Sequence, residues 1–160
     1  MKLDIGCGRN KKADFLGVDC AVEVRPDIVA DMWSVPFDDD SVDEIFSTHA
    51  LEHAYKGQVV PTLKEWERLL RPGGTIDLEV PDLIWCCLNW LRHRTNDWHM
   101  DAIFGNQDHV PGELHKTGFT PEIMHGYVAQ TRLVVEREEV IRSHGQPTLR
   151  FLLRRRHAEG

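Results

Sequence analysis

Short apolar runs alternate with segments of helical spacing along most of the chain. The apolar runs predict strands over residues 2–8, 15–20, 26–32, 41–50 and 75–82. Apolar residues at helical spacing predict a helix over residues 63–70, and the glycines of RPGG (71–74) are expected to end it. This alternation is typical of an α/β protein, with a mostly parallel sheet covered by helices.

The second half of the chain predicts two more helices and a closing hairpin. Residues 83–93 are largely apolar, so we expect a well-buried helix there. Thr120 and Pro121 suit the N-cap and first position of a helix over residues 120–130. Two strands, expected over residues 132–141 and 147–156, are predicted to pair as a hairpin.

Two segments of this half lack a clear element. Residues 94–118 are polar and without periodicity, which suits a lid over a site. The basic tail from Arg150 onward predicts an edge strand followed by a frayed end.

Composition narrows the class of protein. The 160 residues suit one domain over residues 1–160, with 41% hydrophobic and 28% charged residues, as in a soluble globular protein. A formal net charge of −7 argues against a nucleic-acid partner. No signal peptide or membrane span is evident, and the four cysteines form no C-x-x-C pair. We therefore expect a reduced cytoplasmic protein without membrane contact.

The first crossover of the expected sheet is unusually short. Only six residues separate Gly8 from Phe15, whereas parallel neighbours normally need about a dozen or more, usually including a helix. The first crossover helix is therefore expected to be reduced or absent, and no helix precedes the first strand. The sheet face left without cover favours a partner, such as a second copy of the chain in a homodimer.

Chemistry-bearing residues follow three successive strands. Gly6 and Gly8 come directly after the first strand, where ligands bind in open α/β sheets, although a plain tight turn explains them as well. Lys11 stands where a dinucleotide fingerprint has its third glycine, and no P-loop is present. Asp19 ends the second strand, where an acid can accept hydrogen bonds from ribose hydroxyls. Asp31 ends the third, where a carboxylate can accept from an adenine amino group.

At this point the chain resembles a known family. The runs LDIGCG, GVD, DIVADMWSVPFDDDSVDEIFSTHALEH and LLRPGGTIDLEVPD are similar, in this order, to class I S-adenosylmethionine-dependent methyltransferases of the small type 11 kind. The resemblance covers residues 2–82, and HKTGFTPE (115–122) is similar to a later segment of these enzymes. It implies a Rossmann-like α/β fold with helices on both faces of a seven-stranded sheet, in the order 3-2-1-4-5-7-6 with the seventh strand antiparallel.

The resemblance also implies a set of residues that bind S-adenosyl-L-methionine. The first motif holds the methionine portion, Asp19 the ribose, and Asp31 with Met32 the adenine, while the end of the fourth strand lies beside the sulfonium. The full set is Asp4, Gly6, Cys7, Gly8, Asp19, Asp31, Met32, Ser47, Thr48 and His49.

The run STHALEH (47–53) permits two kinds of site. His49, Glu52 and His53 form H-x-x-E-H, the inverted zinc-peptidase pattern, and a third ligand could come from His99, Asp108, His109 or His115. Alternatively, these histidines are hydrogen-bonded in the core or line a pocket. Read after the glycine loop, the run is better explained by the end of a strand and the start of a helix, so no metal is predicted.

The pocket role predicts the catalytic residues. A hydroxyl acceptor needs a base to take its proton, and histidine suits this because its pKa lies near neutrality. We expect His53 or His115 as the base, with His49 and Glu52 as further candidates; Glu52 would orient a histidine or bind the acceptor. STHA stands where amino-methylating DNA enzymes carry D/N-P-P-Y/F, and this difference favours a small acceptor over a nucleobase. The acceptor group that we expect first is a hydroxyl of a sugar or another metabolite.

Several alternatives to this prediction stay open. N- or C-methylation of the acceptor is compatible with the same residues. A non-catalytic S-adenosylmethionine-binding module, or a subunit of a larger transferase, explains the small size as well. A zinc hydrolase built on HALEH is the third alternative.

Overall fold

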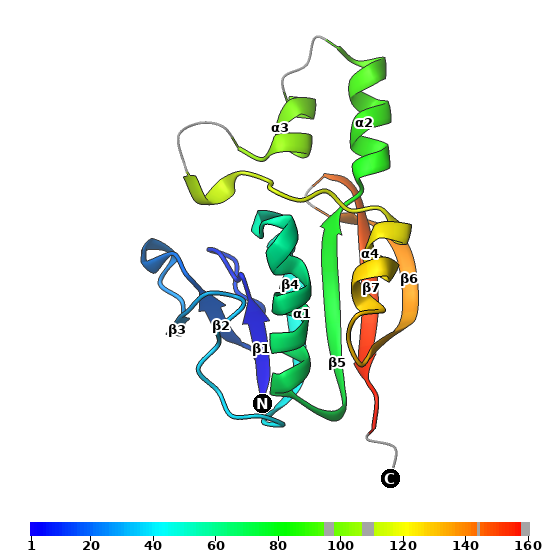
Figure 1. Ribbon diagram of the computed structural model, residues 1–160. Coiled ribbons are helices and arrows are strands. Elements are labelled where there is room, and N and C mark those ends of the chain that lie inside the picture. The colour runs from blue at the N-terminus through cyan, green and yellow to red at the C-terminus, as the bar shows by residue number, and fades with distance from the viewer. Residues whose placement is uncertain (95–97, 107–110, 144, 158–160) are drawn as a thin grey trace.

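The seven strands form one sheet in the order β3-β2-β1-β4-β5-β7-β6 (Figure 1). This computed structural model describes residues 1–94, 98–106, 111–143 and 145–157. The strands are β1 (Lys2–Ile5), β2 (Leu16–Asp19), β3 (Ile28–Val29), β4 (Val42–Thr48), β5 (Leu70–Pro81), β6 (Leu133–Ser143) and β7 (Gln146–Arg155). Strands β1 to β5 pair in parallel, and β7 runs antiparallel to β5 and β6. The predicted Rossmann-like order is confirmed.

In the part of the chain that the structure describes, four α-helices and three short 3-10 helices connect these strands. They are α1 (Lys56–Leu69), α2 (Leu83–Arg92), α3 (Trp98–Phe104), α4 (Pro121–Val128), η1 (Val22–Val24), η2 (Leu51–His53) and η3 (Pro111–Glu113). Residues 6–15 contain turns and no helix, so the predicted loss of the first crossover helix is confirmed. The Thr120 hydroxyl caps α4 by accepting from the Ile123 amide, as its sequence position predicts.

Three predicted boundaries shift in the structure. Helix α1 begins at Lys56, seven positions before the predicted start, and contains Pro61 in its second turn. RPGG follows that helix as predicted, but it lies inside β5, where Gly73 has a φ of 82°. Strand β3 ends at Val29, so Asp31 lies in a turn closed by the Ser34 amide bonding to the Asp31 carbonyl.

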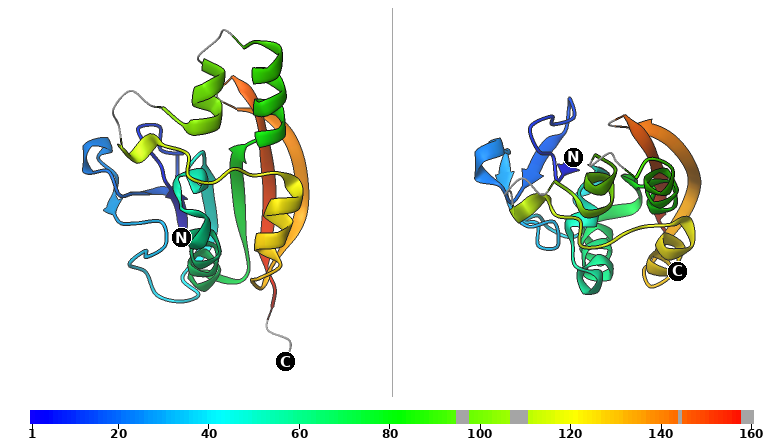
Figure 2. Two further views of the ribbon diagram at one scale, coloured as in Figure 1. Left: turned by 45° about the horizontal axis from the view of Figure 1, so that its top comes forward. Right: turned by 90° about the horizontal axis from the view of Figure 1, so that it is seen from above.

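Helices cover one face of the sheet only. Helices α1 and α4 lie on the same side, as the view from above shows (Figure 2). Their face is apolar: Leu3, Ile45, Ile76 and Leu153 are paired in register across four strands and are fully buried. The expectation of helices on both faces therefore holds for one face of the described sheet.

The opposite face is built from charged and polar side chains. Arg150 donates to both carboxylate oxygens of Asp77 at 2.7 Å, and the Lys12 ammonium lies 3.6 Å from the centre of the Phe46 ring. The Thr48 hydroxyl donates to Glu79 at 3.0 Å on the same face. These mutually paired groups satisfy one another without a helical layer, which is why the face tolerates the lost crossover helix.

Helix α2 is exposed, and the prediction of a well-buried helix is wrong. It stands beyond the end of β5 and contacts α3 (Figure 1). Cys86 is its one buried residue, whereas Ile84, Leu88 and Leu91 are about half exposed. Apolar composition alone cannot tell whether a sheet lies beneath a helix, and here the helix extends past the sheet.

The basic tail also differs from the prediction of an edge strand. Strand β7 lies between β5 and β6, and β6 is the edge. Leu149, Phe151 and Leu153 of β7 are buried in the core, which explains the apolar residues between the arginines.

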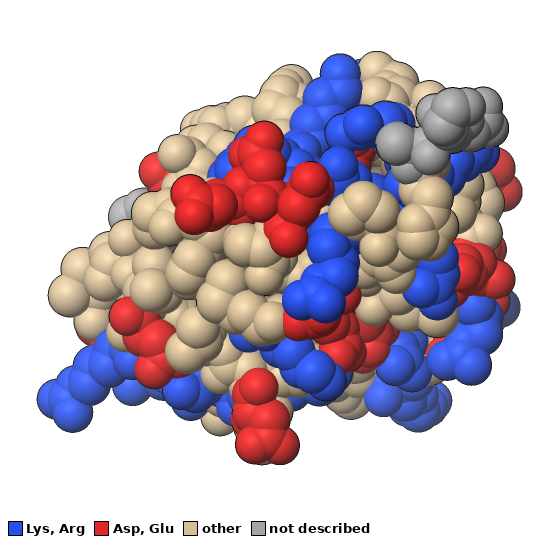
Figure 3. Space-filling view, turned by 90° about the horizontal axis from the view of Figure 1, so that it is seen from below, with Lys and Arg blue, Asp and Glu red and all other residues tan. Residues whose placement is uncertain are grey.

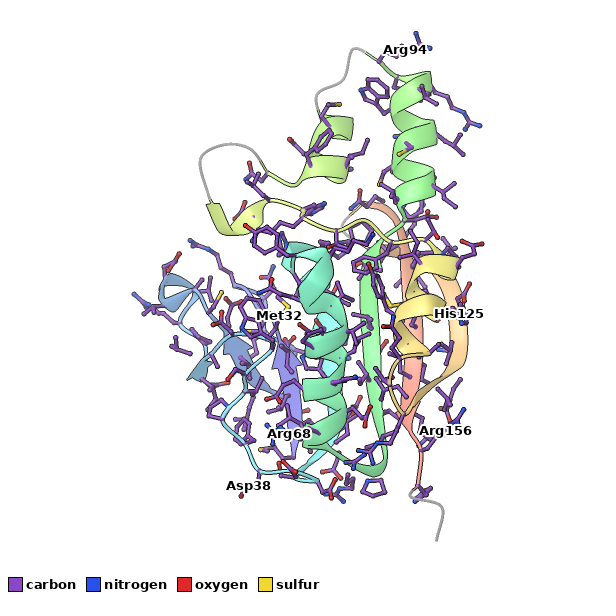
Figure 4. All side chains as sticks on the ribbon, viewed as in Figure 1. Met32, Asp38, Arg68, Arg94, His125 and Arg156 are labelled. Atoms are coloured by element: carbon purple, nitrogen blue, oxygen red, sulfur yellow. The ribbon has the colours of Figure 1, made fainter. Side chains whose placement is uncertain are left out.

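The end of the molecule opposite α2 carries charges of both signs (Figure 3). Arg68 pairs with Asp39 at 2.6 Å and Arg71 with Asp43 at 2.7 Å. Arg68 and Asp38 mark this end (Figure 4). No helix among the described residues is long and apolar enough to cross a membrane.

Trp66 connects α1 to the segment that follows β3. Its side chain is fully buried, and its Nε1–H donates to the Met32 carbonyl at 2.8 Å. We expect Trp66→Phe to lower the free energy of unfolding by about 1–3 kcal/mol in urea denaturation, because the partly buried Met32 carbonyl loses its donor. Trp33→Phe, at a residue 36% exposed, should change it by less than about 0.5 kcal/mol. Equal effects of the two variants would contradict this role of Trp66.

Candidate active site

The loop after β1 bends sharply over the end of β2. The amides of Gly6 and Cys7 both donate to the Val18 carbonyl, at 2.8 and 3.2 Å. Gly6 has a φ of 74° and Gly8 a φ of 50°, both in the left-handed region that favours glycine. A Cβ at Gly6 would lie 2.3 Å from the Cβ of Ala50, so the glycine loop packs directly against the segment after β4.

Asp4 holds the returning chain of the first crossover. Its Oδ2 accepts from the Lys12 amide at 2.7 Å, and its side chain is 1% exposed. Burial raises the pKa of this carboxyl, against the opposing effect of the Lys12 amide and ammonium. Burial likewise raises the pKa of Cys7 to about 11, which keeps that thiol protonated and unreactive.

The two predicted nucleoside acids differ in their surroundings. Asp19 accepts from the amides of Gly8 and Ala21, each at 2.9 Å, so its carboxylate is fixed beside the glycine loop. Asp31 is exposed, and Met32 is partly buried against the core. The Asp19 carboxylate is therefore held in place by the glycine loop, whereas the Asp31 carboxylate is exposed to solvent.

The end of β4 leads directly into the histidine cluster. Ser47 is fully buried, and His49 adopts a φ of 49°, which is uncommon for a residue with a side chain. The His49 ring lies between two partners: Nδ1 is 3.4 Å from Glu52 Oε1, and Nε2 is 3.4 Å from the Thr148 hydroxyl. The turn at His49 brings its ring beside the strand β7, far away in the sequence.

Glu52 lies at the centre of three histidines. Its side chain is 1% exposed, and His115 Nε2 lies 3.9 Å from Oε1. The rings of His53 and His115 are in edge-to-face contact, with centroids 5.2 Å apart. Burial disfavours the charged carboxylate, but the three neighbouring histidines outweigh burial, so the pKa of Glu52 lies below its usual value. Burial also lowers the pKa of His115.

Residues 114–119 pass over η2 and complete the cluster. The amides of Lys116 and Thr117 both donate to the Glu52 carbonyl, at 2.8 and 3.1 Å. The Thr117 hydroxyl donates to the Ala54 carbonyl at 2.8 Å, and Thr117 is buried. This part of the predicted lid is hydrogen-bonded to η2 and to the residue that follows it, and forms a wall beside Glu52.

The structure brings some of the predicted site residues together and leaves others outside the cluster. His115, predicted together with His53 as a candidate base, reaches the cluster although it lies more than 60 positions from His53. Asp108 and His109 lie outside the described residues, as does the side chain of His99. The predictions missed Thr148, whose position on β7 follows from the hairpin register but whose contact with His49 does not.

Comparisons with known proteins bear on the family and the fold. Residues 3–77 match the Methyltransferase domain family of type 11. No curated protein sequence matches the chain.

Solved structures show the same fold over nearly the whole chain. An S-adenosylmethionine-dependent methyltransferase from Methanosarcina mazei is 18% identical, with a TM-score of 0.69 over 97% of this chain and 92% of that one. One from Mesorhizobium loti is 15% identical, with a TM-score of 0.66 over 96% and 90%. The 1,6-didemethyltoxoflavin-N1-methyltransferase of Burkholderia thailandensis is 14% identical, with a TM-score of 0.65 over 98% and 71%.

Proposed function

We propose that this chain, which belongs to the S-adenosylmethionine-dependent methyltransferases, methylates a hydroxyl group of a small acceptor such as a sugar or another hydroxylated metabolite. The observation that carries the proposal is the buried Glu52 with its three histidines, placed where β4 ends beside the glycine loop. A hydroxyl needs a proton acceptor at this place, and histidine is the side chain best suited to it.

The residues around the glycine loop fit S-adenosylmethionine. Gly6 leaves no room for a side chain, so a ligand can approach the backbone there. Asp4 Oδ1 and Ser47 Oγ are buried without a hydrogen-bond partner among the described residues, as expected of groups that face a polar ligand. We assign Asp4, Gly6, Cys7 and Gly8 to the methionine portion, Asp19 to the ribose and Asp31 with Met32 to the adenine.

The sulfonium of the bound cofactor supplies an electrophilic methyl group, so the protein has to align the acceptor and take its proton. We propose His49 as the base. Glu52 Oε1 lies 3.4 Å from Nδ1 and would stabilise the imidazolium, while Nε2 takes the proton from the acceptor hydroxyl, which would replace the long 3.4 Å contact with Thr148. His53 and His115 are the bases expected from the sequence. We propose instead that they line the part of the site where the acceptor binds, next to Glu52.

Three observations support a small acceptor. The end of β4 continues as STHA instead of the tetrapeptide of amino-methylating DNA enzymes, and the chain has a net charge of −7. Residues 114–119 lie over the cluster, and the side chains of His49 and His115 are only 16% and 15% exposed. The Burkholderia thailandensis structure is described with a small acceptor bound, and its N-methylation makes a nitrogen acceptor the second candidate. The homodimer and the absence of a nucleic-acid partner stay predictions.

Calorimetry tests the cofactor residues. We expect the protein to bind S-adenosylhomocysteine, and Asp19→Asn to weaken binding about 10- to 100-fold, because a hydrogen bond to a charged group contributes about 1.5–3 kcal/mol. Asp38→Asn, at the opposite end of the molecule, should bind normally (Figure 4).

A screen of hydroxylated metabolites with methyl-labelled S-adenosylmethionine then tests the acceptor. Labelled O-methyl product supports the proposal, and label found on nitrogen supports the second candidate. Binding of the cofactor with no transfer to any acceptor would instead support the non-catalytic binding module.

A further inference from the structure

Glu52, His53 and His115 bring three potential metal ligands together. One ligand atom from each residue lies within 4.8 Å of the other two. This is not the pair of histidines that H-x-x-E-H uses, because His115 comes from the wall over η2 and takes the place of His49. Two histidines and one carboxylate are a common ligand set for divalent transition metals.

A backbone carbonyl holds the His53 ring in the form that binds a cation. The Leu114 carbonyl lies 3.1 Å from His53 Nδ1, and because a carbonyl can only accept, Nδ1 carries the hydrogen and Nε2 keeps its lone pair. The Nε2 atom of His115 lies 3.9 Å from Glu52 Oε1. Metal-binding histidines usually donate their second N–H in this way.

The carboxylate between these rings lacks a donor. Both oxygens of Glu52 are buried, and neither makes a hydrogen bond within the part of the chain that the structure describes. His49 Nδ1 is the nearest donor, and its 3.4 Å distance gives only a weak electrostatic contact. Buried carboxylate oxygens that make no hydrogen bond have lone pairs available to a cation.

A small cavity borders two of the three ligands. It has a volume of about 10 Å³, enough for about one water-sized group, and is lined in part by Glu52, His115 and Thr117. Ligand atoms on a tetrahedral zinc at about 2.0–2.2 Å are roughly 3.4 Å apart. The ligands therefore need to close by roughly 1 Å or a little more, which side-chain rotation can supply.

We propose that Glu52, His53 and His115 bind a divalent transition-metal cation, with an open coordination position directed to the acceptor. This inference deepens the proposed function and rests on it: the cation would bind an oxygen of the acceptor and hold it in line with the methyl group. Ligands with two neighbouring oxygens, such as vicinal diols or hydroxy acids, are the acceptors that such a site would favour.

Cobalt and zinc chloride test the site without any acceptor. The measurements use protein carrying Cys20→Ser and Cys87→Ser, because these two exposed thiols would bind the same metals. We expect stoichiometric binding of Co²⁺, with the visible absorption bands of a site of low coordination number, and displacement by Zn²⁺. His115→Ala and His53→Ala should each weaken binding by about 100-fold or more, since loss of an outer-shell partner alone costs about 10- to 100-fold.

Two control variants separate this site from others. His125 lies on α4, away from the cluster, and pairs with Glu138, so His125→Ala should bind cobalt normally (Figure 4). His49→Asn should also keep the site, whereas a site of the H-x-x-E-H kind would lose it.

The outcomes distinguish the two proposals. Absence of cobalt binding at millimolar concentration, or equal loss in His125→Ala, overturns the metal site. If the same protein still binds S-adenosylhomocysteine in calorimetry, the proposed function stands without the metal. If S-adenosylhomocysteine fails to bind while cobalt binds, the proposed function fails and the metal site stands by itself.

Discussion

Gly6→Ala is expected to abolish S-adenosylmethionine binding and to lower the free energy of unfolding by about 2–5 kcal/mol. Two causes add here. The φ of 74° costs a residue with a side chain about 1–2 kcal/mol, and overpacking costs about 1–3 kcal/mol more. The new Cβ would lie 2.3 Å from the Ala50 Cβ, so the glycine loop has to move away from the end of β4. That movement displaces the backbone that the cofactor would contact.

Two further variants separate these causes. Gly8→Ala meets nothing within 4 Å at a φ of 50°, so it should cost only the conformational term of about 1–2 kcal/mol. Ala50→Gly combined with Gly6→Ala removes the atom that clashes, and we expect it to restore part of the cofactor binding.

Thermal unfolding and calorimetry with S-adenosylhomocysteine measure both effects. If Gly6→Ala binds as tightly as the native protein, the cofactor does not lie against this loop. If the double variant recovers nothing, the contact with Ala50 is not the cause of the loss.

Much of the fold follows from local patterns in the first half of the chain. Strand periodicity and turn chemistry act over a few residues, so they can be read from the sequence. They account for the short apolar runs that end at Asp4 and its glycines, at Asp19 and near Asp31. These same residues carry the resemblance to the family, and the sheet order and the family match over residues 3–77 agree with it. The first crossover without a helix was predictable because it depends only on a count of residues between Gly8 and Phe15.

What the sequence did not predict depends on contacts across long distances. Helix α2 has the composition of a core helix, but it extends beyond the end of β5, where no sheet lies beneath it. The paired charges of Asp77 and Arg150 replace a helical layer, and they meet only because β5 and β7 are neighbours. His115 enters the cluster because residues 114–119 bond to the Glu52 carbonyl, which no periodicity encodes.

Glu52→Gln is the second large effect that we expect: kcat falls by about 100- to 10,000-fold with cofactor affinity unchanged. The amide keeps the shape of the side chain but loses the charge that orients His49 and stabilises its protonated form. Stability should fall as well, because the neighbouring histidines hold the pKa of Glu52 below its usual value and the folded protein therefore favours the charged carboxylate. A fall in kcat with unchanged binding of S-adenosylhomocysteine is therefore the signature of a functional Glu52.

A double-mutant cycle with His49→Asn tests whether the two residues act as a unit. Asparagine tolerates the φ of 49° at this position, so the variant removes the imidazole without new backbone strain. If Glu52 works through His49, each single variant and the double variant should lose nearly the same factor in kcat, because residues that act together are strongly non-additive. Losses that multiply would show that Glu52 contributes by a separate route, and full turnover in His49→Asn would exclude His49 as the base.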